Sequence, residues 1–212
     1  MNLLAVLENG LFALSQVLRL PVMVLLWVCV ASVLFMAGAS LMEFAGRRRE
    51  RRGFRIADWL RAGPALSADA ARRAALPAVL RHFLDAARVR QGAGGLADGD
   101  LEHLVLERED ALRRALTPSR VLVRVGPSLG LLGTLIPMGS ALAALAAGNL
   151  EAMAGQMIVA FTTTIVGLAT GTLAFVVATA RNAWTTETIR DQRYLAEQMS
   201  AELGRAEPAA GH

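Results

Sequence analysis

Hydroxyl groups in the second half of the chain are the first feature that could do chemistry, because they lie in two long uncharged runs. No charged residue occurs between Arg124 and Glu151, or between Glu151 and Arg181. Each run is long enough to span the hydrocarbon core of a membrane as a helix. Hydroxyls at that depth can support a hydrated path for ions without placing a fixed charge in the membrane. The groups belong to Thr134, Thr162, Thr163, Thr164, Thr170 and Thr172.

Most threonines in membrane helices donate their hydroxyl to a backbone carbonyl one turn back. We expect this bond for Thr170, Thr172 and Thr179. Three threonines in succession must spread around the helix. One or two of them can bond to their own backbone, while another meets a neighbouring helix or water. Thr134 lies near mid-depth on the facing helix, so the candidates for lining an ion pathway are Thr134 and one or more of Thr162, Thr163 and Thr164.

Glycines recur in the same two runs, where lipid contact alone would favour Leu, Ile and Val. The spacings Gly126 to Gly130 and Gly167 to Gly171 are small-xxx-small patterns, which let two helix backbones approach closely. The close contact could lie within one subunit or between subunits. The predicted helix-packing residues are Gly126, Gly130, Gly133, Gly167 and Gly171.

Composition excludes several classes of function. Of the 212 residues, 54% are hydrophobic and 19% charged, and the charges are gathered into blocks, as in a membrane protein. The net charge of +4 comes wholly from arginines that flank the apolar runs without interleaved aromatic residues, which argues against nucleic-acid binding. Cys29 is the single cysteine, so neither an internal disulfide nor a metal cluster is expected. Neither a catalytic constellation nor a phosphate-binding loop is present, so we expect no enzyme and no cofactor.

The first part of the chain reads as two elements. Residues 1–20 place leucines at helical spacing, which predicts an amphipathic helix at the membrane interface that contacts lipid or neighbouring subunits. Residues 21–42 carry no charge and form the first predicted transmembrane helix, about 33 Å long. This helix has few glycines and hydroxyls, so it is the better candidate for facing lipid.

A basic patch follows the first span. By the positive-inside rule this end lies in the cytoplasm, which puts the N-terminus outside. Two alternatives for the patch are binding of anionic lipid and docking of a cytoplasmic partner. Its residues are Arg47, Arg48, Arg49, Arg51 and Arg52.

The rest of the chain completes an all-α integral membrane protein with three transmembrane helices. Residues 43–125 are predicted to form a cytoplasmic helical segment, with a break or kink at Pro77 and a glycine-rich loop over 91–99. The remaining predicted elements are a second span at 126–147, an external turn at 148–152, a third span at 153–180, and a cytoplasmic helix and tail at 181–212.

Two motifs in the hairpin carry a family resemblance. The string GPSLGLLGT at 126–134 resembles the second-helix signature of the MotA/TolQ/ExbB proton-channel family. TIVGL at 164–168 resembles the Thr-x-x-Gly-Leu pattern of that family's third helix. Arg181-Asn182 resembles the residues at which that helix leaves the membrane. The three-span topology is closer to ExbB and TolQ than to the four-span MotA.

The resemblance implies a homo-oligomer in the bacterial inner membrane, pentameric in this family, around a two-copy, single-span partner of the ExbD/TolR/MotB type. Proton flow would drive work such as outer-membrane import, envelope maintenance or motility. Thr134 and Thr164 match the family's pore-lining threonines. Two positions depart from the family pattern: Val159 stands where ExbB and TolQ carry a glutamate, and Pro137 replaces a usual glycine.

Because the spans contain no titratable carboxylate, our hypothesis is that an intramembrane aspartate on the partner carries the proton while Thr134 and Thr164 solvate it. A structural scaffold without conduction remains the alternative, favoured by Val159. A substrate permease is disfavoured, because the chain has neither an internal repeat nor an intramembrane charge.

Overall fold

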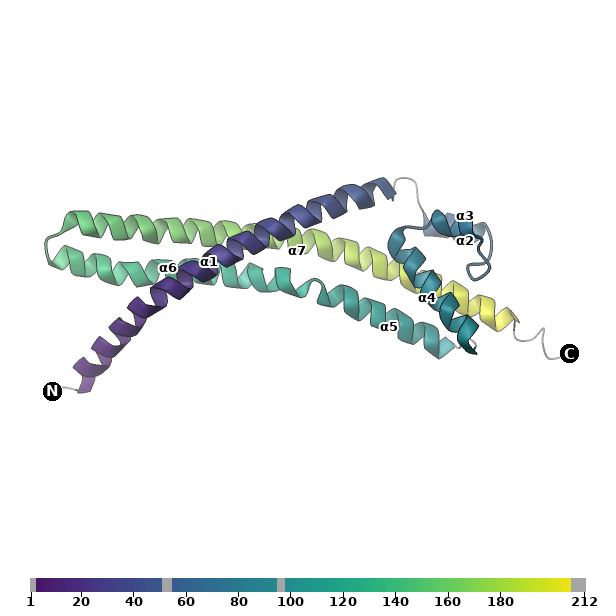
Figure 1. Cartoon of the computed structure of the whole chain (residues 1–212), viewed down its shortest axis with the longest axis horizontal. Helices are drawn as coiled ribbons and strands as arrows, with labels where there is room; N and C mark the ends of the chain where they lie inside the picture. The colour runs from purple at the N-terminus through teal and green to yellow at the C-terminus, as the bar shows by residue number, and fades with distance from the viewer. Residues whose placement is uncertain (1–2, 51–54, 95–97, 207–212) are drawn as a thin grey trace. The chain divides into compact units, whose positions relative to one another are not determined.

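The computed structural model describes residues 3–50, 55–94 and 98–206, and every regular element in these ranges is a helix. Three of the helices, α1, α6 and α7, are long and apolar enough to cross a membrane. The chain is therefore an all-α integral membrane protein. The helices are α1 (Leu3–Glu50), α2 (Ile56–Arg61), α3 (Ala70–Ala74), α4 (Ala78–Gly94), α5 (Asp98–Arg114), α6 (Thr117–Ala146) and α7 (Leu150–Ala206) (Figure 1).

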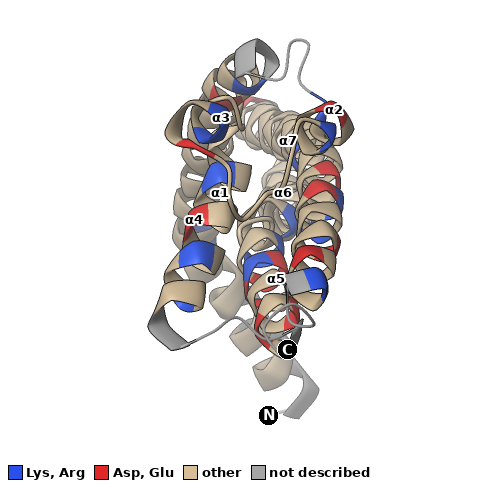
Figure 2. Cartoon of the chain, turned by 90° about the vertical axis from the view of Figure 1, so that its right-hand side faces the viewer, with Lys and Arg blue, Asp and Glu red and all other residues tan. Residues whose placement is uncertain are grey.

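The chain folds as two compact units. The first, called here the apolar unit, contains α1 as far as Ala39, α6, and α7 as far as Thr179. The second, called the polar unit, contains α1 from Ser40, helices α2 to α5, and α7 from Ala180. Figure 2 shows the charged residues that colour α4 and α5 in the polar unit.

Two predicted boundaries lie inside continuous helices. The interfacial helix expected at 1–20, from Leu3 onward, and the span expected at 21–42 belong to the single helix α1, which passes through Pro21. A proline inside a helix removes one backbone hydrogen bond, but α1 continues on both sides of Pro21. The third span and the C-terminal helix are likewise one helix, α7.

The polar unit corrects one sequence prediction. The expected break at Pro77 is present, because α4 begins directly after it at Ala78. The glycine-rich loop expected at 91–99 is wrong at both ends, since α4 continues to Gly94 and α5 starts at Asp98. The helix continues through the glycines because each costs only about 1 kcal/mol relative to alanine. Helix α4 is stabilised by a fully buried face that includes Phe83 and Leu84.

A short turn joins α6 and α7 into an antiparallel hairpin (Figure 1). Gly148 adopts a left-handed conformation with φ of 72°. The backbone N–H groups of Gly148 and Asn149 donate to the carbonyls of Leu145 and Ala144, each at 2.9 Å, which is the Schellman pattern. The Asn149 side chain then caps α7 by accepting from the N–H of Ala152 at 2.9 Å. One residue therefore completes the end of α6 and the start of α7.

Helix α1 packs against this hairpin within the apolar unit. Its buried stripe of Val22, Leu26 and Cys29 forms a core cluster with Leu129 of α6. Three partly buried residues complete the cluster, and they are Leu122, Ile136 and Val166. The opposite side of α1 remains apolar but uncovered, with Phe35 78% exposed.

The polar unit has a core of its own. Trp59, Phe83, Leu104, Leu195 and Met199 meet there from α2, α4, α5 and α7. This segment is a packed helical unit, in which residues far apart in sequence share one hydrophobic core.

A buried carboxylate ties α5 to α7 in the polar unit. Glu109 is only 8% exposed, and Arg193 of α7 donates to it at 2.5 Å. Arg113, one turn further along α5, donates to the other carboxylate oxygen at 2.9 Å. These two hydrogen bonds, that of Arg193 first, hold the pKa of Glu109 below its ordinary value despite its burial.

We predict that Glu109→Gln destabilises the polar unit by about 1 kcal/mol at pH 7, because both arginine partners remain more than half exposed to solvent. A carboxylate with a lowered pKa stabilises the fold above its unfolded-state pKa, and this contribution is lost as the pH falls through its folded-state pKa. The difference between wild type and variant should therefore shrink below about pH 4. Thermal unfolding of the detergent-solubilised chain, followed by Trp59 fluorescence after Trp27→Phe and Trp184→Phe, measures it.

The matched control is Glu107→Gln. Glu107 pairs with Arg90 at 3.1 Å, and both side chains are at least 40% exposed, so little change is expected. Equal effects of the two substitutions would contradict the role given to Glu109.

Candidate functional site: the glycine seam and its threonines

Helices α6 and α7 touch backbone to backbone along a line of small residues, called here the glycine seam. A Cβ atom placed on Gly167 would lie 2.6 Å from the Cα atom of Gly130, well inside van der Waals contact. A Cβ on Gly126 would lie 3.1 Å from the backbone nitrogen of Gly171. The structure thus places the two small-xxx-small motifs opposite each other within one subunit.

The seam continues on both sides of this central contact. Towards the turn, a Cβ on Gly133 would lie 2.7 Å from the Cβ of Thr163. At the other end, a Cβ on Gly171 would lie 2.6 Å from the Cγ of Pro127. All five predicted packing glycines therefore lie in the seam, which is formed by Gly126, Gly130 and Gly133 of α6 and by Thr163, Gly167 and Gly171 of α7.

The three consecutive threonines have different surroundings. The hydroxyl of Thr162 donates to the carbonyl of Ile158 at 2.8 Å, and that of Thr163 to the carbonyl of Ala160 at 2.8 Å. Thr163 is only 5% exposed, so it packs inside the subunit. Thr164 is half-buried, and its hydroxyl has no hydrogen-bond partner among the residues that the structure describes.

Thr134 is the corresponding hydroxyl on α6. It is half-buried, and its Oγ1 donates to the carbonyl of Leu131 at 2.7 Å. Each oxygen lone pair of such a hydroxyl can still accept a hydrogen bond. Thr134 follows Gly133 directly, and the Cα of Thr164 lies 3.5 Å from a Cβ placed on Gly130, so both threonines border the seam.

Both threonines lie on the side of the hairpin that α1 does not cover. Helix α1 packs beside Leu129 and Ile136 of α6 and beside Val166 of α7. At about 100° per residue, Thr134 is about 140° from Leu129 and 160° from Ile136, and Thr164 is about 160° from Val166. The hairpin therefore has an α1-covered face and an open face, and the open face carries Thr134 and Thr164.

The open face is otherwise apolar and large. Its side chains are between 42% and 61% exposed, and they include Leu131, Leu135, Met138, Phe161 and Leu168. An extended apolar face bordered by two hydroxyl groups is suited to contact with lipid or with other membrane helices.

Val159 lies on the covered face. With Ile158 and Thr162 of α7 it lines an apolar groove of about 360 Å³, whose other wall comes from α1 and includes Leu26 and Trp27. The Val159 side chain therefore faces α1. It lies about 140° around the axis of α7 from Thr164.

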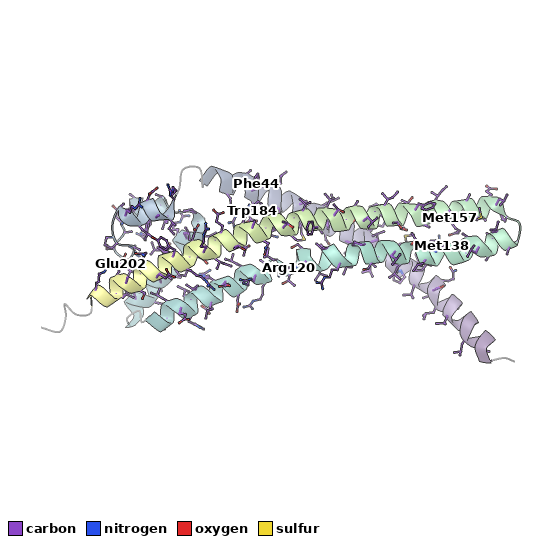
Figure 3. The ribbon with its side chains drawn as sticks, turned by 180° about the vertical axis from the view of Figure 1, so that it is seen from behind. Phe44, Arg120, Met138, Met157, Trp184 and Glu202 are labelled. Carbon is purple, nitrogen blue, oxygen red and sulfur yellow. The ribbon has the colours of Figure 1, made fainter. Side chains whose placement is uncertain are left out.

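The basic patch is described only in part. Arg47 forms an ion pair with Glu43 at 2.7 Å and donates to Thr188 at 3.4 Å. Beside it, Phe44 of α1 stacks on Trp184 of α7 with the ring centroids 5.4 Å apart (Figure 3). The side chains of the other predicted patch residues lie outside the described residues; these are Arg48, Arg49, Arg51 and Arg52.

Sequence reasoning missed the partners of Arg47. Glu43 stands four residues earlier, a spacing that favours an ion pair on a helix. Glu43 also approaches Arg181 of α7 at 3.8 Å. The pairing with α7 had no comparable signal, because it joins residues more than a hundred positions apart.

We predict that Gly167→Ala destabilises the apolar unit by about 1–3 kcal/mol, because the added methyl group would overlap the backbone of Gly130. Gly155→Ala on the same helix is the control, since a Cβ there meets nothing within 4 Å. That control should leave stability unchanged or raise it slightly. Thermal unfolding in detergent measures both, and equal stability of the two variants would rule out a tight seam.

Comparison with known proteins matches residues 74–194 to the model of the MotA/TolQ/ExbB proton channel family. The matched range is more than half of the chain, and it includes α6, the seam, and both Thr134 and Thr164. A comparison with curated proteins gave no match. The three apolar helices are consistent with the three-span ExbB/TolQ type. The chain belongs to the MotA/TolQ/ExbB proton channel family.

Proposed function

We propose that this chain is the pore-forming subunit of a motor complex driven by the proton-motive force. Several copies, five in the expected assembly, surround a single-span partner of the ExbD/TolR/MotB type in the inner membrane. The observation that carries the proposal is the placement of Thr134 and Thr164 together on the open face of the hairpin, opposite α1. Helix α1 then faces lipid, and the open face meets the neighbouring copies and the partner.

The partner supplies the group that ionises. Between Arg124 and Glu151, and between Glu151 and Arg181, the apolar unit contains no charged residue. Val159 replaces the glutamate of ExbB and TolQ, and it lines a groove beside α1 rather than the open face. An aspartate on the partner helix would therefore be the proton carrier, as an ionisable group within a membrane is usually functional.

The two threonines have different hydrogen-bonding capacity towards such a carboxylate. The Thr164 hydroxyl, without a partner among the described residues, can donate to the ionised form. The Thr134 hydroxyl already donates to Leu131, so it can accept from the protonated form. A partner carboxylate that moves between subunits would thus find a donor when it is charged and an acceptor when it is neutral.

The energy available from the membrane is sufficient for such a cycle. Moving one elementary charge through 100 mV is worth about 2.3 kcal/mol. Packed helices can switch between discrete arrangements that differ by a few kcal/mol. Proton flow can therefore drive stepwise movement of the partner and deliver work outside the membrane. In this orientation the N-terminus lies outside and the arginine-rich segments lie in the cytoplasm.

We predict that Thr164→Val lowers proton flux at least about tenfold, because a lost hydrogen bond to a charged group costs about 1.5–3 kcal/mol. Flux is measured in vesicles that contain the subunit and its single-span partner, with the assembly checked by its mass. Thr162→Val is the control, because Thr162 lies two residues away, faces the α1 side and bonds to its own backbone.

Three results are informative here. Loss of flux in Thr164→Val alone, with assembly intact, supports the proposal. Full flux in Thr164→Val would remove this residue from the pathway. A wild-type assembly that forms but carries no protons would favour the alternative of a scaffold without conduction.

A further inference from the structure

Polar side chains on three helices lie beyond the end of the glycine seam that is nearest the turn. The Nε2 atom of Gln16 in α1 donates to the Oγ atom of Ser140 in α6 at 2.9 Å. On α7, the Oε1 atom of Gln156 is buried and has no hydrogen-bond partner among the described residues. Glutamine and serine are unexpected inside apolar helices unless another polar group meets them.

The register of the seam places Gln156 opposite Ser140. Gly133 packs against Thr163, and two further helical turns are seven residues. Seven residues forward from Gly133 on α6 is Ser140, and seven residues back from Thr163 on α7 is Gln156. The register persists in this region, because Met138 and Met157 lie on facing stretches of the two helices (Figure 3). The side chain of Gln156 therefore continues the α6-facing stripe of Ala160 and Thr163.

The hydrogen-bonding capacity of the three groups is incomplete without a further molecule. A buried carbonyl oxygen that lacks a donor costs about 1–3 kcal/mol. The Ser140 hydroxyl accepts from Gln16 and keeps its own O–H as a donor. Water can accept from this O–H and donate to the Gln156 oxygen, and a buried water needs two to four such partners.

We propose that Gln16, Ser140 and Gln156 bind water between the three helices of each subunit. The site lies six residues, or about 9 Å along α6, from the helix end at the turn. It lies a further six residues from Thr134, again about 9 Å. From Gly133 to Gly126 the seam is closed, by the Thr163 side chain at Gly133 and by the α7 backbone at Gly130 and Gly126, so the water stops before this level.

A use for this water rests on the proposed function. It would bring external water halfway from the turn to Thr134, and so shorten the distance that a proton travels between bulk water and the partner's carboxylate. The binding of water itself depends only on the three polar groups. The two statements therefore fail separately.

The test is the reactivity of a thiol at the site. In a Cys29→Ala background, Ser140→Cys is treated with silver ion in the assembled complex, and the unreacted thiol is then counted after denaturation. Silver ion reaches thiolates through water, so Ser140→Cys should react about tenfold or more faster than Leu142→Cys, which lies near the same depth on the exposed side of α6. Equal rates, or protection of Ser140→Cys by a neighbouring copy, would overturn the proposal.

A second substitution tests the role of Gln156. Adding Gln156→Leu should slow the silver reaction of Ser140→Cys several-fold, because the bridging acceptor is lost. An unchanged rate would remove Gln156 from the site. Proton flux of the single variant Gln156→Leu is then compared with that of wild type. Reduced proton flux would support a role of the bound water in conduction. Unchanged proton flux, in a complex that conducts, would rule out that role without affecting the conclusion from the silver reaction that water binds at the site.

Discussion

The contact between the backbones of α6 and α7 is the constraint on which the rest of the apolar unit depends. Because Gly130 and Gly167 have no side chains, the helices approach until main-chain atoms touch. Every neighbouring residue is then assigned to one side of the seam or the other. Thr163 is buried by the contact, whereas Thr134 and Thr164 are left at its border. The glycines therefore act indirectly, by deciding which hydroxyl groups a neighbouring molecule can reach.

The sequence was sufficient to predict the three apolar helices and the glycines at which helices pack closely, but it left open whether that contact lies within one subunit or between subunits. Uncharged runs of suitable length and glycines spaced by four residues are local signals, and both correspond to features of the fold. Local signals also indicated that adjacent threonines would differ, although they did not say which would lie inside. Which threonine lies inside depends on where α1 packs, and α1 is apolar around most of its circumference, with Phe35 exposed opposite its buried stripe.

Interactions between distant residues were beyond sequence reasoning, and the polar unit shows why. The carboxylate of Glu202 accepts from the backbone N–H groups of Ala65 and Leu66 at 2.6 and 3.0 Å. Arg88 donates to the carbonyls of Leu66 and Ala68, each at 2.6 Å. These bonds fix an irregular segment by satisfying its backbone groups, but no spacing in the sequence links Glu202 to Ala65. The same limit applies to Gln156, which is an unremarkable glutamine until the register of the seam places it opposite Ser140.

The turn at Gly148 restricts the motions available to the hairpin. Asn149 belongs at once to the end of one helix and the cap of the next, so no slack remains between them. Sliding α7 past α6 by one helical turn would take about 5.4 Å of extra chain, which this connection does not contain. The two helices must therefore tilt or rotate as a single stiff piece, and any working stroke has to take place at the outer surfaces of that piece.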